Sequence, residues 1–164
     1  MPTATDAELV DLLTAGTLTP VGRLVVLAGG TPQGEPVVAP HSPEPALRTV
    51  AVLDAVLNNS DRKGSHLMRE GSIVRGCDHG VSLGVEPKLR TVLWGWAGDQ
   101  IPDTDLARLD ALARALDGSL ATDLAPLLTA VEVAALKARV RTLLATRRHP
   151  LPTPGWPAIP WPAL

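Results

Sequence analysis

The sequence predicts an α+β domain that is predominantly helical, and three observations support this fold class. Apolar residues recur at helical spacing over most of residues 105–144. Residues 67–80 combine short apolar runs with a Gly71-Ser72 turn, a pattern typical of a β-hairpin. The chain is 45% apolar but contains no Phe or Tyr, so Leu, Val and Ala must fill its core, which favours helices packed through small and branched side chains.

The first 44 residues predict a short, strand-containing N-terminal arm. We expect Thr5–Thr14 to form a helix that stops at Gly16, and Val21–Ala28 to form a strand. Residues 29–45 hold five prolines and three glycines, which is typical of a linker or irregular loop. The predicted organisation is therefore an arm and linker over 1–44, a main domain over 45–148 and a tail over 149–164.

The main domain is expected to open and close with helices. Pro45 suits a first helical turn, and that helix should end at the polar residues 58–60. We expect further helices at Glu86–Trp96 and at Asp105–Leu116, the latter closing at Gly118. An apolar stripe predicts one more helix, and Thr129–Glu132 matches a capping box that would open the last one. The stripe comprises Leu120, Leu124, Leu127 and Leu128.

The tail should be extended, because its last 15 residues include six prolines. We expect Trp156 and Trp161 to dock on the domain, and Trp94 and Trp96 to lie in the core.

Composition and charge argue against several classes of function. A net charge of −2 and a pI near 6.0 give no long-range attraction to nucleic acid. Apolar runs such as Leu24–Ala28 are too short to span a bilayer, and the N-terminus has acidic residues where an export signal would be basic. A single cysteine, Cys77, excludes an internal disulfide. We therefore expect a cytoplasmic protein without a membrane span or a nucleic-acid partner.

Two short motifs, Asn58–Leu67 and Asp78–Gly80, hold the residues with candidate chemistry. Asp61 and His66 are five positions apart, and Asp78 follows Asp61 by 17 positions, beyond the expected hairpin. A hairpin of that length can bring both carboxylates to one metal–phosphate centre. Phosphoryl transfer requires such parts: a carboxylate that orients the attacking hydroxyl, oxygen ligands for magnesium, and positive charge near the phosphates.

At these residues the chain resembles the phosphatidylinositol 3-/4-kinase-like proteins. It is more similar to an actinobacterial family assigned to that superfamily, whose substrate is not established. The resemblance covers roughly residues 45–164, and less firmly 6–25. It rests on four matches in the same order: Asn58–Leu67, Asp78–Gly80, Lys88–Trp94 and Trp156–Pro162.

This resemblance implies a kinase-like large lobe whose hairpin carries the site. Asp61 would be the catalytic base or orienting group, Lys63 a phosphate or charge stabiliser, and Asp78 the principal Mg²⁺ ligand. His66 stands where better-known kinases have a metal-binding Asn, and imidazole suits Mn²⁺ or Zn²⁺ better than Mg²⁺. His79 replaces the packing Phe of the metal motif. The implied cofactors are ATP with Mg²⁺ or Mn²⁺.

Each of these residues also has a structural interpretation. Asp61 could cap a turn after the helix end, and His66 and His79 could be hydrogen-bonded structural residues. For the basic residues Lys88 and Arg90 we favour ion pairs with Glu86 or Asp99 on a solvated face. Cys77 and the tryptophans at 94 and 96 are better explained as core residues than as reactive or ligand-binding groups.

The half of a kinase site that grips the nucleotide is not recognisable. No lysine precedes Lys63, and about 45 residues are too few for a five-stranded nucleotide lobe. The jump from the Val21–Ala28 strand into the Pro-rich linker resembles an internal deletion. Exposed apolar surface would then remain where that lobe docks, and a partner protein or a second copy of the chain is expected to cover it.

Three function classes follow from this. The first is a phosphotransferase whose nucleotide lobe is reduced or supplied by a partner. The second is a non-catalytic, pseudokinase-like binding module or remnant. The third, which is weaker, is a small metal-dependent hydrolase that uses Asp61, His66, Asp78 and His79.

Overall fold

The computed structural model of the chain describes residues 45–70 and 73–163. The expected helix Thr5–Thr14, the strand Val21–Ala28 and the linker before residue 45 lie outside the described residues. Helices dominate the part that is described, as the sequence predicted. Its elements are α3 (Pro45–Leu57), η1 (Gly64–His66), β1 (Leu67–Glu70), β2 (Ile73–Gly76), η2 (Trp94–Trp96), α4 (Asp103–Asp117), α5 (Ser119–Leu124) and α6 (Ala130–Thr146).

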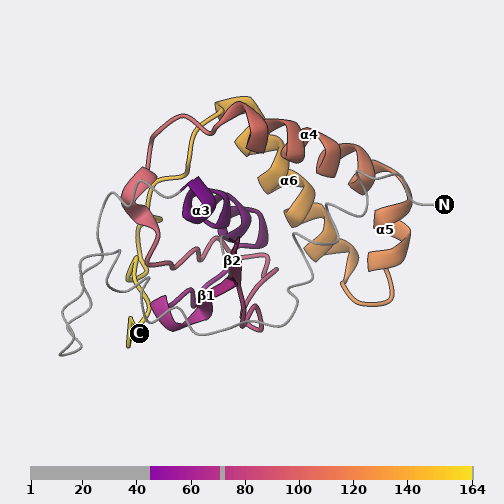
Figure 1. Ribbon diagram of the computed structural model, residues 1–164. Helices are drawn as coiled ribbons and strands as arrows, with labels where there is room; N and C mark the ends of the chain where they lie inside the picture. Colours follow the sequence, from indigo (N-terminus) through magenta and orange to yellow (C-terminus); the bar gives the residue numbers. More distant parts are fainter. Residues whose placement is uncertain (1–44, 71–72, 164) are drawn as a thin grey trace.

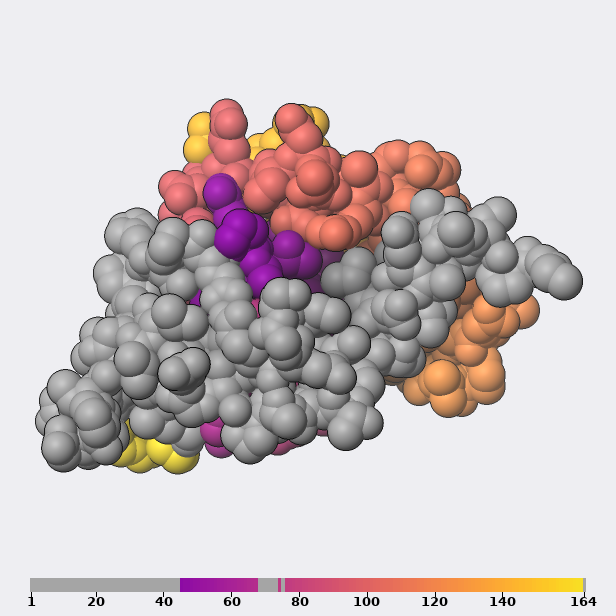
Figure 2. Space-filling model, in the orientation of Figure 1, coloured from indigo at the N-terminus to yellow at the C-terminus, as the bar shows by residue number. Residues whose placement is uncertain are grey.

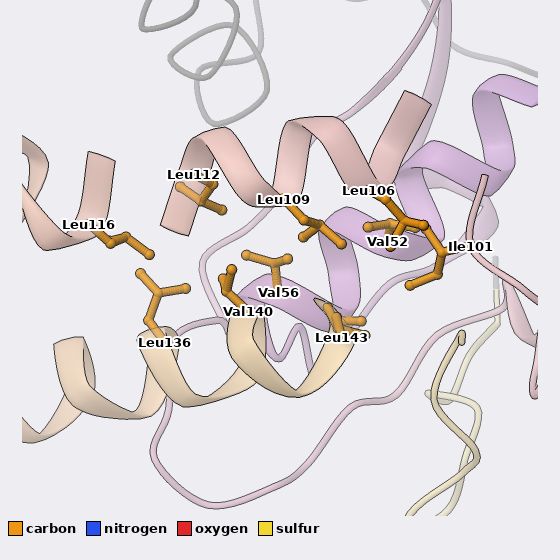
Figure 3. Packing of buried hydrophobic residues seen from close by; sticks show 11 residues of the cluster. Val52, Val56, Ile101, Leu106, Leu109, Leu112, Leu116, Leu136, Val140 and Leu143 are labelled. Atoms are coloured by element: carbon orange, nitrogen blue, oxygen red, sulfur yellow. The ribbon is translucent and has the colours of Figure 1, made fainter. Parts of the chain in front are cut away.

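Three helices form the main core. Helices α4 and α6 lie side by side, and α3 packs against α6 (Figure 1). The buried side chains of this core are leucines, valines, one isoleucine and one alanine, so the expectation that Leu, Val and Ala fill most of it is confirmed (Figure 3). Trp94 and Trp96, which were expected in the core, are only half-buried, and Trp96 packs against a second apolar cluster. Leu116 and Val140 are completely buried. Each such side chain contributes about 1.5–3 kcal/mol through removal of its apolar surface from water.

The boundaries of α4 and α6 follow from their end residues. Helix α4 starts with Asp103 and Asp105 in its first turn, where acidic groups complement the helix dipole, and it ends before Gly118. Helix α6 opens with the predicted capping box, in which Thr129 and Glu132 each bond the backbone of the other. The predicted leucine stripe before it is only partly correct. Helix α5 ends at Leu124, and the side chain of Leu127 is 77% exposed.

The predicted hairpin is confirmed. Strands β1 and β2 pair antiparallel, with Leu67 opposite Gly76, which places His66 and Cys77 side by side at the open end. There the Cys77 N–H donates to the His66 carbonyl at 2.8 Å. A second, smaller apolar cluster fixes the hairpin against α3. Its buried members are Leu47, Val50, Ala51, Leu67 and Leu93.

The helix predicted at Glu86–Trp96 is wrong. This segment is extended, and only the short turn η2 is helical. Its backbone groups bond to distant parts of the chain: Arg90 N–H donates to the Asn59 carbonyl and Val92 N–H to the Arg62 carbonyl. The backbone groups of this segment form these long-range hydrogen bonds instead of helical ones. Pro87 also has no N–H to donate to a helical hydrogen bond.

The tail is extended, as predicted, but its tryptophans do not anchor it. Trp161 is 85% exposed, and Trp156 lies at the surface with its ring 3.9 Å from the Lys88 ammonium. The buried residues of the tail are instead His149, Pro160 and Ala163. Docking of the tail therefore depends on its backbone and its small residues rather than on its large rings.

In the space-filling view, atoms of α3 are visible directly beside those of α4 (Figure 2). No helix in the described ranges has the length and apolar character required to cross a membrane.

Candidate functional site

The first motif begins where α3 ends, and the side chain of Asn58 closes that helix. Asn58 has a φ of 52°, in the left-handed region that asparagine tolerates well at helix ends. Its amide nitrogen donates to the carbonyls of Gly84 and Glu86, and its amide oxygen accepts from the Lys88 N–H. One buried asparagine thus links the helix end to the chain segment that follows the second motif.

Residues 59–62 run between two extended neighbours. On one side the Ser60 N–H donates to the Val81 carbonyl at 3.0 Å. On the other side Arg62 and Thr91 form a parallel bridge, in which Arg62 N–H donates to the Arg90 carbonyl at 3.1 Å. These bonds fix the backbone of the first motif against the segments that come after the second.

Beneath this loop lies a completely buried ion pair between Arg62 and Asp54 of α3. Both side chains have 0% exposure, and Arg62 Nη2 is 2.8 Å from Asp54 Oδ1. Arg62 Nε also donates to both carboxylate oxygens at 3.0 Å. Asn59 Nδ2 and Thr91 Oγ1 donate to the same carboxylate at 3.1 and 3.2 Å. The charge of Asp54 is therefore matched by one cation and two neutral donors, as a buried carboxylate requires.

The remaining donors of Arg62 bind the second motif. Arg62 Nη1 donates to the Cys77 carbonyl at 2.7 Å, and Nη2 lies 2.9 Å from His79 Nε2. The guanidinium lies flat against Gly76, where an added Cβ would come within 2.9 Å of Nη2. Arg62 thus joins the two motifs to one buried carboxylate. Gly76 has no side chain and so leaves space for the guanidinium.

Two acidic side chains stand above this buried layer, each with a basic partner. The Asp61 carboxylate lies 3.1 Å from Lys63 Nζ, and Asp78 Oδ2 lies 3.5 Å from His66 Nε2. Asp61 and Lys63 are partly exposed, whereas Asp78 is 61% exposed. Asp78 also has a φ of 54°, so its backbone is in a region that few residues other than glycine and asparagine adopt readily.

The two histidines are held in their neutral forms. Burial, and then the nearby Arg62 cation, lower the pKa of His79. Because a guanidinium only donates, His79 Nε2 must accept from Arg62, which leaves its proton on Nδ1.

Burial likewise lowers the pKa of His66, against the opposing fields of Asp78 and, more weakly, Asp61. Its Nδ1 accepts from the Lys63 N–H at 3.5 Å, so the proton of the neutral ring is on Nε2, facing Asp78.

The structure groups the four predicted residues into two linked pairs. Lys63 lies beside Asp61 and His66 lies beside Asp78, and the hydrogen bond from the Lys63 N–H to His66 Nδ1 joins the two pairs. In the described ranges, no group of three or more His, Cys, Asp or Glu side chains is arranged to hold a metal ion. Within that part of the chain, Asp78 and His66 are two possible ligands at one point, with Asp78 Oδ2 3.5 Å from His66 Nε2.

Two structural alternatives are also settled. The turn after α3 is closed by Asn59, whose Oδ1 accepts from the Asp61 N–H, so the Asp61 carboxylate is not the cap. The expected ion pairs of Lys88 and Arg90 with nearby acids are wrong. Lys88 lies over the Trp156 ring, and Arg90 donates to the carbonyls of Pro157 and Ile159.

Sequence reasoning missed the buried layer. Asp54, Arg62, Thr91 and Gly76 were not singled out, although they hold the two motifs together. The signal was present at Asp54, the one acidic residue in the otherwise apolar run 50–57. A lone carboxylate on the buried face of a helix requires a buried cation.

Together the fold and the site define a mostly helical α+β domain. In it, the buried Arg62–Asp54 pair supports the two loops that bear Asp61 and Asp78. Protein Rv2133c of Mycobacterium tuberculosis is 46% identical to this chain over 158 residues. The match covers 95% of this chain and 56% of that protein, so the chain spans about half the length of this relative. No family model matches the chain, and no solved structure matches it.

Proposed function

We propose that this chain is the large-lobe part of a kinase-like phosphotransferase, related to the phosphatidylinositol 3-/4-kinase-like proteins and acting in the cytoplasm. One observation carries the proposal. Arg62 binds Asp54, the Cys77 carbonyl and His79 together, so the loops that bear Asp61 and Asp78 are fixed to the same buried point. A phosphoryl-transfer site needs these two carboxylates in adjacent loops.

In this proposal each side chain has one role. Asp61 accepts a hydrogen bond from the attacking hydroxyl and orients it toward the phosphate. Lys63, which pairs with Asp61 in the free protein, supplies positive charge beside the phosphate oxygens. Asp78 and His66 would be the protein ligands of the divalent cation. The exposure of Asp78 suits this role, because a ligand must reach the carboxylate from solvent.

The residues present fit a divalent cation that is held partly by its substrate. Mg²⁺ is usually bound by one or two carboxylates together with phosphates and water, so a cluster of three protein ligands is not required. The neutral His66 ring next to Asp78 favours Mn²⁺ over Mg²⁺, because imidazole is the softer ligand. Such an ion would neutralise charge on the phosphates when bound.

The nucleotide-binding groups have no counterpart in the described residues. We propose that a reduced N-terminal lobe or a partner protein supplies them, and the longer relative is compatible with additional chain in that role. The second candidate is a non-catalytic binding module. It is favoured by the Asp61–Lys63 pair, because an ammonium 3.1 Å from the Asp61 carboxylate competes with an incoming hydroxyl for the same oxygen atoms.

A calorimetric titration of the full chain with ATP, in the presence of either Mg²⁺ or Mn²⁺, separates these candidates. We expect metal-dependent binding that Asp78→Ala abolishes. Asp78→Asn tests the same carboxylate without the strain of placing alanine at positive φ. The matched control is Asp123→Ala, at an exposed position in α5.

The outcomes discriminate clearly. Unchanged binding by both Asp78 variants would refute the assignment of the site. A folded wild-type chain that binds no nucleotide with either metal would favour the binding module. Release of phosphate from a phosphate ester without nucleotide would favour the metal-dependent hydrolase.

A further inference from the structure

The tail runs along the outer side of the segment that supports the first motif. Thr91 N–H donates to the Ala158 carbonyl at 3.0 Å, and Trp94 Nε1 donates to the same oxygen at 2.8 Å. Thr91 in turn pairs with Arg62. Three backbone segments therefore lie side by side here, each bonded to the next: the tail, residues 90–92 and the residues around Arg62.

Arg90 fastens the tail at two further points. Its Nε donates to the Pro157 carbonyl at 2.9 Å and its Nη2 to the Ile159 carbonyl at 3.3 Å. Pro160 and Ala163 are buried, whereas Trp161 and Pro162 between them are exposed. The tail is thus seated by backbone bonds and by two small side chains as far as Ala163.

The end of the tail bonds directly to the first motif. Gly64 N–H donates to the Ala163 carbonyl at 2.8 Å. Gly64 begins the single turn η1, which separates Lys63 from His66. Because the turn has three residues, a shift of Gly64 moves the side chains on both sides of it.

We infer that residues 157–163 are a positioning element of the site, which holds Gly64 and thereby sets the relative placement of Lys63 and His66. The part of this inference that concerns ligand binding rests on the proposed function. The part that concerns Gly64 does not. The hydrogen bonds of the tail go to Gly64 and to residues 90–94, so the tail acts on the site through the backbone of the loop.

The test is amide hydrogen exchange of Gly64 by NMR in the full chain without ligand. In Ala163→Glu, a charged side chain replaces a buried methyl group and cannot be accommodated, so the end of the tail must leave. Trp161→Glu is the matched control, because it introduces the same side chain two residues away at an 85% exposed position. Arg90→Ala is a second variant, which loosens the tail without adding a buried charge.

We expect Gly64 exchange to accelerate roughly five- to tenfold in Ala163→Glu and in Arg90→Ala, as loss of one hydrogen bond implies. It should stay unchanged in Trp161→Glu. The Asn59 amide, which bonds to the Asp54 carbonyl, should keep its rate in all variants and reports that the fold is intact. Unchanged Gly64 exchange in Ala163→Glu would overturn the inference.

The same variants are then titrated with ATP and Mn²⁺. We expect about three- to tenfold weaker binding in Ala163→Glu and wild-type binding in Trp161→Glu. Faster Gly64 exchange with unaltered affinity would overturn the positioning role. If the wild-type chain binds no nucleotide, the proposed function fails, while the exchange rates still decide whether the tail holds the loop.

Discussion

Replacing Arg62 with methionine tests whether the buried ion pair organises the site. The substitution keeps a flexible, unbranched apolar stem but removes the cation that faces Asp54 at 2.8 Å. Asp54 would remain completely buried, with only the Asn59 and Thr91 donors from its present set. Removal of one partner from a buried pair costs about 3–5 kcal/mol, because the other charge is left without compensation.

Such a loss is large relative to the whole fold. Domains of this size are stable by about 5–15 kcal/mol, so Arg62→Met should remove at least about a fifth of the free energy of unfolding. Urea unfolding followed by tryptophan fluorescence measures it. Arg114→Met is the control, because Arg114 is 68% exposed and pairs with Asp110 on the surface of α4. Its loss should change the free energy of unfolding by less than about 0.5 kcal/mol.

A double-mutant cycle tests whether the loss of stability comes from the broken Arg62–Asp54 pair. Asp54→Leu alone leaves a buried guanidinium without its carboxylate, whereas the Asp54→Leu, Arg62→Met double variant buries no charge. We expect the double variant to be more stable than the sum of the single effects by about 2–3 kcal/mol. Additive effects, or a cost of less than about 1 kcal/mol for Arg62→Met alone, would refute the view that this pair holds the two motifs together.

Two further predictions concern the same layer and the pH dependence of stability. Gly76→Ala should destabilise the fold by about 1–3 kcal/mol, because its methyl group would lie within 2.9 Å of a guanidinium that Asp54 holds in place. Gly84→Ala, where nothing lies within 4 Å of the added carbon, should be neutral in the same urea experiment. Burial, and then the neighbouring Arg48 cation, lower the pKa of His149 from 6.5 to about 4. Since the unfolded chain takes up this proton first, the free energy of unfolding should fall by up to about 3 kcal/mol as the pH drops from about 6.5 to 4. His149→Gln should flatten that slope, and an unaltered slope would show that other groups cause it.

The helices were predictable because each is encoded by its own residues. The leucines of α4 recur on one face, and the Thr129–Glu132 box marks the start of α6 within four residues. The segment around Arg90 was not predictable in this way. Its conformation depends on bonds to Asn59, Arg62 and the tail, which are distant in sequence. Trp161 misled for a related reason, since a large apolar ring suggests burial but the tail is seated by its backbone.

The candidate residues could be selected from the sequence, but the residues that support them could not. The spacing of the motifs and the family resemblance selected Asp61, Lys63, His66 and Asp78, and the structure places these residues in two pairs, 3.1 and 3.5 Å apart. The role of Arg62 did not follow, because within an Asp-Arg-Lys triplet the middle residue looks like one more surface charge. Only the fold reveals that it points inward to Asp54.

The interior location of Arg62 has a consequence for how such sequences diverge. A gene that had lost its chemistry would still be under selection to retain Asp54, Arg62 and Gly76, because the loss of any one of them lowers the stability of the fold. Persistence of those positions among descendants therefore reports on folding. The carboxylates of Asp61 and Asp78 reach solvent and belong to no buried network, so stability alone does not require both of them. Retention of these two acids together in a lineage would be the record of a site that is still in use.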